Sequence, residues 1–187
     1  MDVFDKAALT EALRAGERAK YVFFWSHNRR HPSDAPGAEQ LSQWAETPFA
    51  VDGVRYATAE HFMMAEKARL FGDEAALARI LAAASPGAAK AFGREVRNFD
   101  QEAWEAARED VVFRGSLAKA EQNQSVGAFL SATGARVLAE ASPRDAIWGI
   151  GLAKDHADAE RPEAWPGLNL LGFALMRARA ALRERLG

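Results

Sequence analysis

The sequence of 187 residues contains no cysteine. Disulfide bonds and thiolate metal sites are therefore excluded, and such a chain is typical of a reducing compartment. It also lacks a strong charge of either sign, because 24 basic side chains stand against 26 acidic ones for a formal net charge of -2. No global electrostatic field thus draws the chain to nucleic acid or to an anionic membrane, although a local basic cluster is compatible with this balance.

Long apolar runs, low-complexity tracts and internal repeats are missing as well. No segment reaches the length of a membrane-spanning helix, and the first 20 residues carry four carboxylates without an apolar core, unlike a secretory signal. We therefore expect a soluble cytoplasmic protein that binds no membrane. Hydrophobic residues make up 49% of the chain, which is enough to bury the core of one domain. We expect that domain at residues 21–187, after a lead-in segment at residues 1–20.

The order of local patterns predicts a mainly α single domain of the α+β class with a small β element. Residues 21–25 are aromatic and β-branched, which favours a strand. Residues 49–56 contain two short strand-like runs joined by Asp52-Gly53, a strong hairpin signal. Helix starts are predicted at Asp73, Ser85-Pro86, Asp100 and Asn169. This order argues against a doubly wound parallel sheet.

The segment at residues 58–72 is predicted to be a helix, with Thr58 as its N-cap and Gly72 after its end. At about 100° per residue, Glu60 and Lys67 fall on one face and interrupt an apolar stripe. They lie about 10 Å apart along the axis, too far for an i,i+4 ion pair but suited to two groups that close on one ligand. The alternative is structural: Glu60 complements the helix dipole and Lys67 extends its head to solvent.

A polar loop after the first predicted strand places Asn28, Arg29 and Arg30 between His27 and His31. One interpretation is a solvated surface loop, and the other is an anion clamp, because arginine forks match phosphate geometry. A metal site on the two histidines is disfavoured, since no acidic ligand accompanies them. We predict neither a metal nor a cofactor.

Two later helical residues raise the same question of anion binding. Arg114 falls on the apolar face of the helix that starts at Asp100, and Lys119 follows it. Arg114 either skirts the core with its long side chain or points, with Lys119, at a bound anion.

Residues 147–152 form a short apolar run that contains Gly149 and Gly151 around Trp148. Glycines at alternate positions let a backbone approach a ligand closely, and Trp148 could stack on a flat heterocycle. A buried tryptophan at a tight bend is equally consistent with the pattern. Asp155 and Asp158 follow in a polar loop and are further acid–base candidates.

Together these segments resemble the NADAR family, also called the YbiA-like family. The resemblance spans residues 21–182 and rests on the sequences at 41–44, 51–53, 58–67, 114–122, 147–152 and 169–172. It implies a mainly helical YbiA-like fold and N-glycosidase activity. The implied substrates are phosphorylated ribosylamines of early riboflavin synthesis or, in other members, guanine in nucleic acid that carries ADP-ribose.

The motif glutamate, lysine and tryptophan of the family correspond to Glu60, Lys67 and Trp148. Shorter members have an aspartate where this chain has Ile150, so Asp155 or Asp158 would have to supply a second acid. The resemblance thus implies Glu60, Lys67 and Asp155 as catalytic residues. Our candidate substrate-binding residues are Asn28, Arg29, Arg30, Arg114, Trp148, Gly149 and Gly151.

The chemistry of such a bond allows two routes. Cleavage through an oxocarbenium-like state needs a carboxylate to activate water and an acid for the departing amine. Opening of the sugar to an imine can instead use a lysine that forms a Schiff base. We assign Glu60 as general acid/base and Lys67 as nucleophile or electrostatic stabiliser. A non-catalytic reader of ADP-ribose is the alternative from another class, and the oligomeric state stays open.

Overall fold

The computed structural model describes residues 3–27 and 35–186, and within these ranges the chain is mainly helical with a small β element, as the sequence predicts. The helices are α1 (Lys6–Arg14), α2 (Ala59–Leu70), α3 (Glu74–Leu81), α4 (Pro86–Arg94), α5 (Gln101–Gln122), α6 (Gln124–Ala132) and α7 (Leu170–Leu186). The strands are β1 (Tyr21–Phe24), β2 (Phe49–Val51), β3 (Val54–Tyr56) and β4 (Val137–Glu140), and 3-10 turns lie at Ala38–Leu41 and Pro162–Ala164. None of the described helices combines the length and apolar character needed to cross a bilayer.

The predicted hairpin is confirmed. Strands β2 and β3 pair antiparallel, and Asp52 and Gly53 both have positive φ, 51° and 77°, as a two-residue hairpin turn of the I′ type requires. Phe49 and Tyr56 lie opposite each other in this register. Both rings pack near Phe62 of α2, with centroids 5.8 Å and 5.1 Å away, so the hairpin fixes the position at which α2 begins.

Helix α2 lies at the centre of the group formed by α3, α4 and α5, and it contacts all three. Its start is capped as predicted, because the Thr58 hydroxyl accepts a hydrogen bond from the His61 N–H, and Gly72 has a φ of 66° after its end. The expectation of a single apolar stripe is too narrow. Every residue from 59 to 65 is buried, because neighbouring elements cover the first turns on several sides.

Strand β4 is absent from the sequence prediction, and it pairs in parallel with β1 from Tyr21↔Val137 to Phe24↔Glu140. The two strands form a sheet of their own among the described residues, so the expectation against a doubly wound sheet holds. Because their carboxyl ends coincide, the residues that follow Phe24 emerge beside Glu140. This edge is the frame of the site described below.

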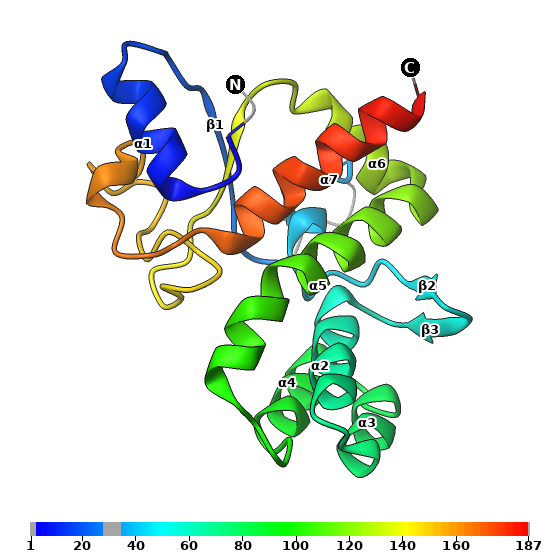
Figure 1. The fold of residues 1–187 in the computed structure, drawn as a ribbon. Coiled ribbons are helices and arrows are strands. Elements are labelled where there is room, and N and C mark those ends of the chain that lie inside the picture. The colour runs from blue at the N-terminus through cyan, green and yellow to red at the C-terminus, as the bar shows by residue number, and fades with distance from the viewer. Residues whose placement is uncertain (1–2, 28–34, 187) are drawn as a thin grey trace.

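Helix α7 packs on β4 and α5 (Figure 1) and fixes the end of β4. Asn169, directly before α7, is fully buried with a φ of 56°. Its side-chain amide donates to the Leu138 carbonyl at 2.9 Å and accepts from the Glu140 N–H at 3.0 Å. A Cβ at Gly172 would stand 2.1 Å from the same Leu138 carbonyl, so glycine is required for α7 to lie this close to the strand.

Candidate active site

A cavity of about 480 Å³ opens at the carboxyl ends of β1 and β4. Its walls come from the residues after β1, the segment before β2, helix α4 and the turn after β4. The lining residues are Trp25, Ser26, His27, Ser42, Trp44, Lys90, Glu140, Ser142, Arg144 and Asp145. The cavity thus collects two indoles, two carboxylates and two permanent cations from segments that are far apart in the sequence.

Glu60 lies directly behind Trp44, which lines this cavity. Its backbone N–H donates to the Gln43 carbonyl at 2.9 Å, and its Oε2 accepts from the Trp44 indole Nε1 at 3.2 Å. Only 2% of the residue is exposed, and Oε1 has no hydrogen-bond partner among the described residues. Burial raises the pKa of the Glu60 carboxyl to about 7, although the Lys90 ammonium and the Trp44 N–H act in the opposite direction.

Glu140 enters the cavity from the last position of β4. Its backbone is held on both sides, because its N–H donates to Asn169 Oδ1 and its carbonyl accepts from the Ile150 N–H at 2.9 Å. Its side-chain Oε2 is buried and has no hydrogen-bond partner in the described part of the chain. Burial, followed by the negative charges of Asp145 and Glu60, raises the pKa of Glu140 to about 8.

Sequence reasoning missed Glu140. The available signal was an acidic residue directly after the apolar run at residues 137–139, since ligands of open α/β sheets bind at the carboxyl ends of parallel strands. That signal needs β1 as the partner of β4, and no local pattern identifies a parallel partner so distant in the chain.

The remaining lining residues offer flat surfaces and positive charge. Trp25 is 51% exposed at the rim, and the His27 and Trp44 rings lie 5.8 Å apart in a tilted arrangement. Lys90 projects from α4, and Arg144 follows β4. Such a lining can stack a heterocycle and bind an anion. The described residues contain no group of three or more His, Asp or Glu side chains arranged to hold a metal ion.

The two lysines singled out from the sequence have different surroundings. Lys67 Nζ lies 4.1 Å from the centroid of the Phe99 ring and 5.9 Å from that of Trp104, and burial lowers its pKa. Neither Lys67 nor Glu60 lines the cavity itself. Glu60 is hydrogen-bonded to the lining residue Trp44, whereas the two rings beside Lys67 belong to residues that do not line the cavity. Lys119 is fully buried and donates to the Ser42 carbonyl at 2.8 Å, and burial lowers its pKa to about 7. Lys119 therefore lies closer to the cavity wall, behind Ser42.

The arginines expected to bind phosphate fall outside the cavity or outside the described residues. Arg114 is exposed and donates to Glu66 at 2.5 Å, with a second carboxylate, Asp110, at 3.4 Å. Its guanidinium lies over the Phe62 ring, and its role as a phosphate ligand stays a prediction. Asn28, Arg29 and Arg30 lie outside the described residues.

The run at residues 147–152 supports the cavity from outside. Gly149 lies so close to the turn after β4 that a Cβ would stand 2.8 Å from the Glu140 carbonyl. Gly151 has a φ of 75°, and a Cβ there would stand 2.7 Å from the Pro166 ring. Trp148 is half-buried, and its backbone N–H donates to Asp145 Oδ1 at 2.8 Å. The two glycines thus permit close approach between backbone segments of the protein itself.

The two aspartates proposed as a second acid do not line the cavity either. Asp155 is exposed. Asp158 accepts from Arg161 at 2.8 Å and lies 3.9 Å from His156. Both belong to the irregular segment between the cavity and α7.

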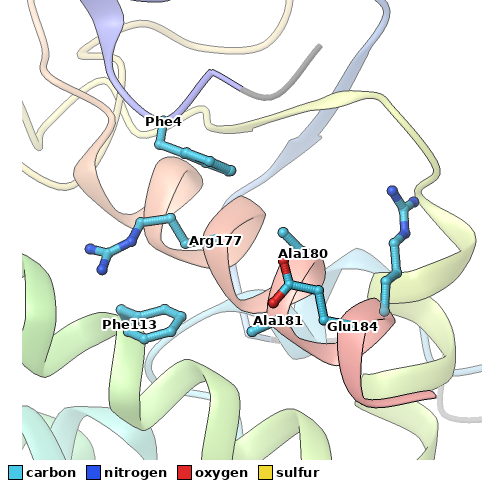
Figure 2. Close-up of a pocket in the computed structure, with 7 residues that line it drawn as sticks. Phe4, Phe113, Arg177, Ala180, Ala181 and Glu184 are labelled. Carbon is cyan, nitrogen blue, oxygen red and sulfur yellow. The ribbon is translucent and has the colours of Figure 1, made fainter. Parts of the chain in front are cut away.

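A second hollow lies between the start of the described chain, α5 and α7, and Figure 2 shows its lining. The guanidinium of Arg177 lies over the Phe113 ring at 4.4 Å, with Phe4 on the other side of the Arg177 side chain in this view and Glu184 further along α7. None of the residues proposed from the sequence lines this hollow, and no buried carboxylate enters it. The carboxylate-lined cavity is therefore the better candidate for chemistry.

Comparison with known proteins supports the same region. A family model described as the NADAR domain matches residues 23–183. The chain is 38% identical over 168 residues to an N-glycosidase of Acanthamoeba polyphaga mimivirus, covering 87% of this chain and 96% of that protein. It is 34% identical over 146 residues to N-glycosidase YbiA of Escherichia coli, covering 78% of this chain and 80% of the relative.

The fold is similar to a solved structure as well. The NMR structure of Escherichia coli YbiA matches with a TM-score of 0.70 and 30% sequence identity, over 91% of this chain and 89% of that one. The matched residues of the family model include every residue that lines the cavity. The similarity therefore covers the site and the helical frame together.

Proposed function

Because the chain belongs to the NADAR family, we propose that it is an N-glycosidase that cleaves the bond between a phosphorylated ribose and the exocyclic amine of a flat heterocycle. Phosphorylated ribosylamines of early riboflavin synthesis are the substrate class. The observation that carries this proposal is Glu60, a buried carboxyl with one unpartnered oxygen behind an aromatic and cationic cavity. Two relatives that carry the name N-glycosidase support the enzyme class.

Glu60 is suited to proton transfer near neutral pH. A carboxyl whose pKa is about 7 is present in both protonation states there, which is the condition for efficient general acid–base catalysis. Its Oε2 is oriented by the Trp44 indole, whereas Oε1 retains its hydrogen-bonding capacity for water or for the sugar. In the proposed reaction the bond from the anomeric carbon to nitrogen breaks, and a bond from that carbon to the water oxygen forms.

We propose that substrate recognition belongs to lining residues of the cavity that the sequence hypothesis did not contain. Lys90 and Arg144 are cations on the wall and would bind the phosphate of the sugar. Trp44 and Trp25 would stack on the heterocycle, a task that the resemblance gave to Trp148. Arg29 and Arg30 stay proposed phosphate ligands, on the grounds of sequence alone.

The route through a Schiff base on Lys67 stays a proposal that one experiment tests. Wild-type protein is incubated with substrate and borohydride, and the intact mass is measured. A sugar adduct that disappears in Lys67→Ala but persists in Lys119→Ala supports Lys67. An adduct that disappears only in Lys119→Ala transfers the role to the amine behind Ser42, and full turnover of wild type without any adduct eliminates the lysine route.

The substrate class is tested by two incubations in parallel, one with a ribosylaminopyrimidine phosphate and one with guanine in DNA that carries ADP-ribose. Release of free ribose phosphate in the first is the expected result. The formal net charge of -2 favours the metabolite mildly, because phosphate contacts dominate affinity for long nucleic acid. Release of ADP-ribose alone would make the second substrate the correct one, and binding without release would indicate a reader.

A further inference from the structure

Two buried carboxyls lie at this cavity, one in its lining and one bonded to a lining residue, and the proposed function uses only one of them. Glu60 lies behind Trp44, whereas Glu140 is itself part of the wall. Each has one side-chain oxygen without a partner in the described ranges. A buried polar atom without a partner destabilises a fold, so two of them beside one cavity call for a functional explanation.

We infer that Glu140 is the second acid–base residue of the site, and that it donates the proton to the departing amine while Glu60 activates water. This assignment rests on the proposed N-glycosidase function. Glu140 can contact a substrate in the cavity directly, whereas Asp155 and Asp158, the candidates from the sequence, do not line it.

The surroundings of the two carboxyls divide the roles. Glu60 accepts an indole N–H on Oε2, and a donor of this kind favours the ionised form. Glu140 Oε2 has no such donor and therefore holds a proton more readily. With these roles, the proton transfers of the reaction balance. Glu140 gives its proton to the leaving nitrogen, Glu60 takes one from the attacking water, and exchange with solvent returns both groups to their starting states.

Most of the charges around the two carboxyls act on both of them. Asp145 raises the pKa of both carboxyls, Lys90 lowers the pKa of both, and Arg94 acts on Glu60 alone. The negative charge of Glu60 also raises the pKa of Glu140. The His27 imidazole and the Arg144 guanidinium complete the polar lining of the cavity.

Contacts on several sides hold the backbone of Glu140 in one position. Pairing with β1, the amide of Asn169 and the Ile150 N–H hold it from three sides. The close approach of Gly149 leaves no room for a side chain there. Residues that hold reacting groups in one geometry reduce the entropy lost in the transition state, which is a role these contacts fit.

The test compares Glu140→Gln with the matched control Glu109→Gln, since Glu109 is an exposed glutamate of α5 that does not line the cavity. The amide is isosteric with the carboxyl but cannot supply the proton, so kcat is expected to fall by about 100-fold or more while KM stays within a few fold. The decline of kcat at high pH, which reports the loss of the Glu140 proton, is expected to disappear in the residual activity. Glu109→Gln is expected to keep both kcat and the shape of the pH profile.

A second variant separates catalysis from folding. Glu140→Asp retains an acid on a shorter side chain, so partial activity with the high-pH decline preserved is expected. Thermal melts of all variants verify that they are folded. Wild-type kcat in Glu140→Gln, or a reduced kcat with an unchanged high-pH decline, would overturn the inference and leave the N-glycosidase function intact. A wild-type protein that releases no sugar from either substrate would overturn the function itself.

Discussion

Glu60 and Asp73 are both buried carboxylates at the start of a helix, exposed by 2% and 3%, and their surroundings differ in every other respect. Asp73 accepts hydrogen bonds from the Ala76 N–H and from the backbone and guanidinium of Arg97, on both oxygens. These hydrogen bonds hold the pKa of Asp73 well below its usual range, and those from the Arg97 side chain have the largest effect. Burial raises the pKa of Glu60 instead.

The difference separates a structural carboxylate from a reactive one. Asp73 joins the start of α3 to the segment after α4, and its charge is fully compensated. Glu60 is left with an unsatisfied oxygen beside a cavity, a condition that lowers stability. Proteins retain such conditions where a group must react.

The largest effect is expected from Glu60→Gln. Loss of the titrating carboxyl should lower turnover by about 100-fold or more with substrate binding preserved. The melting temperature should stay equal or rise, because an amide is less costly to bury than a carboxylate. Turnover assays and calorimetry on the same preparation measure both. A variant that loses stability and turnover together would contradict the comparison.

Asp73→Ala is expected to show the opposite combination. The change removes the N-cap of α3 and the partner of Arg97, so the melting temperature should fall by several degrees. Turnover per folded molecule should remain near wild type, since Asp73 does not line the cavity. The matched control is Asp73→Asn, which keeps one acceptor oxygen. Its melting temperature should lie between those of wild type and Asp73→Ala.

The buried glutamates and Asp73 are also expected to change the pH dependence of stability in opposite directions. Between about pH 5 and pH 7 the unfolded chain has Glu60 and Glu140 ionised, whereas the native state still holds their protons, with pKa values of about 7 and 8. The native state binds more protons, so stability decreases as pH rises through this window. Asp73 behaves inversely, because its pKa is lowered on folding, and its contribution is lost as pH falls below about 4.

Denaturant unfolding measured across these pH values tests both predicted directions of the change in stability. The decrease of stability from pH 5 to pH 7 should be smaller in Glu60→Gln than in wild type. The decrease in acid should be smaller in Asp73→Ala. Equal slopes in wild type and Glu60→Gln would show that Glu60 does not retain its proton on folding.

The smallest effect is expected from Arg114→Ala. Its ion pairs with Glu66 and Asp110 are at the surface, where such pairs contribute about 0–1 kcal/mol. The free energy of unfolding should change by no more than that, and turnover should stay within about twofold. A large loss of substrate binding in this variant would restore Arg114 as a phosphate ligand.

The sequence predicted those parts of the fold that local interactions decide. The Asp52-Gly53 turn and the Thr58 cap involve residues close in the chain, and their side chains specify backbone geometry by themselves. Strand β4 has no comparable local signal, because a parallel strand is defined by a distant partner. The prediction therefore lacked the edge on which Glu140 lies.

The residues of the candidate site were likewise predictable only where a local pattern distinguished them. Glu60 stood out because a carboxyl interrupts an apolar helix, whereas Lys90 and Asp145 look like ordinary surface charges in their own segments. Only the fold gathers them around one cavity. Helical spacing also placed Lys67 on the same face as Glu60. Spacing along one helix does not say which neighbouring element covers each turn, and in the structure Phe99 and Trp104 lie beside Lys67.

The pairing of Tyr21 with Val137 has a consequence for the order in which the protein is made. Closing so long a loop costs chain entropy that only the completed contacts offset. During synthesis, helices α2 to α6 leave the ribosome before β4, and the last wall of the cavity arrives with residues 140–145. The nascent chain thus acquires helices α2 to α6 before the last wall of the cavity, and helix α7, which fixes the end of β4, follows both. No unfinished chain that ends before Glu140 therefore carries a complete site.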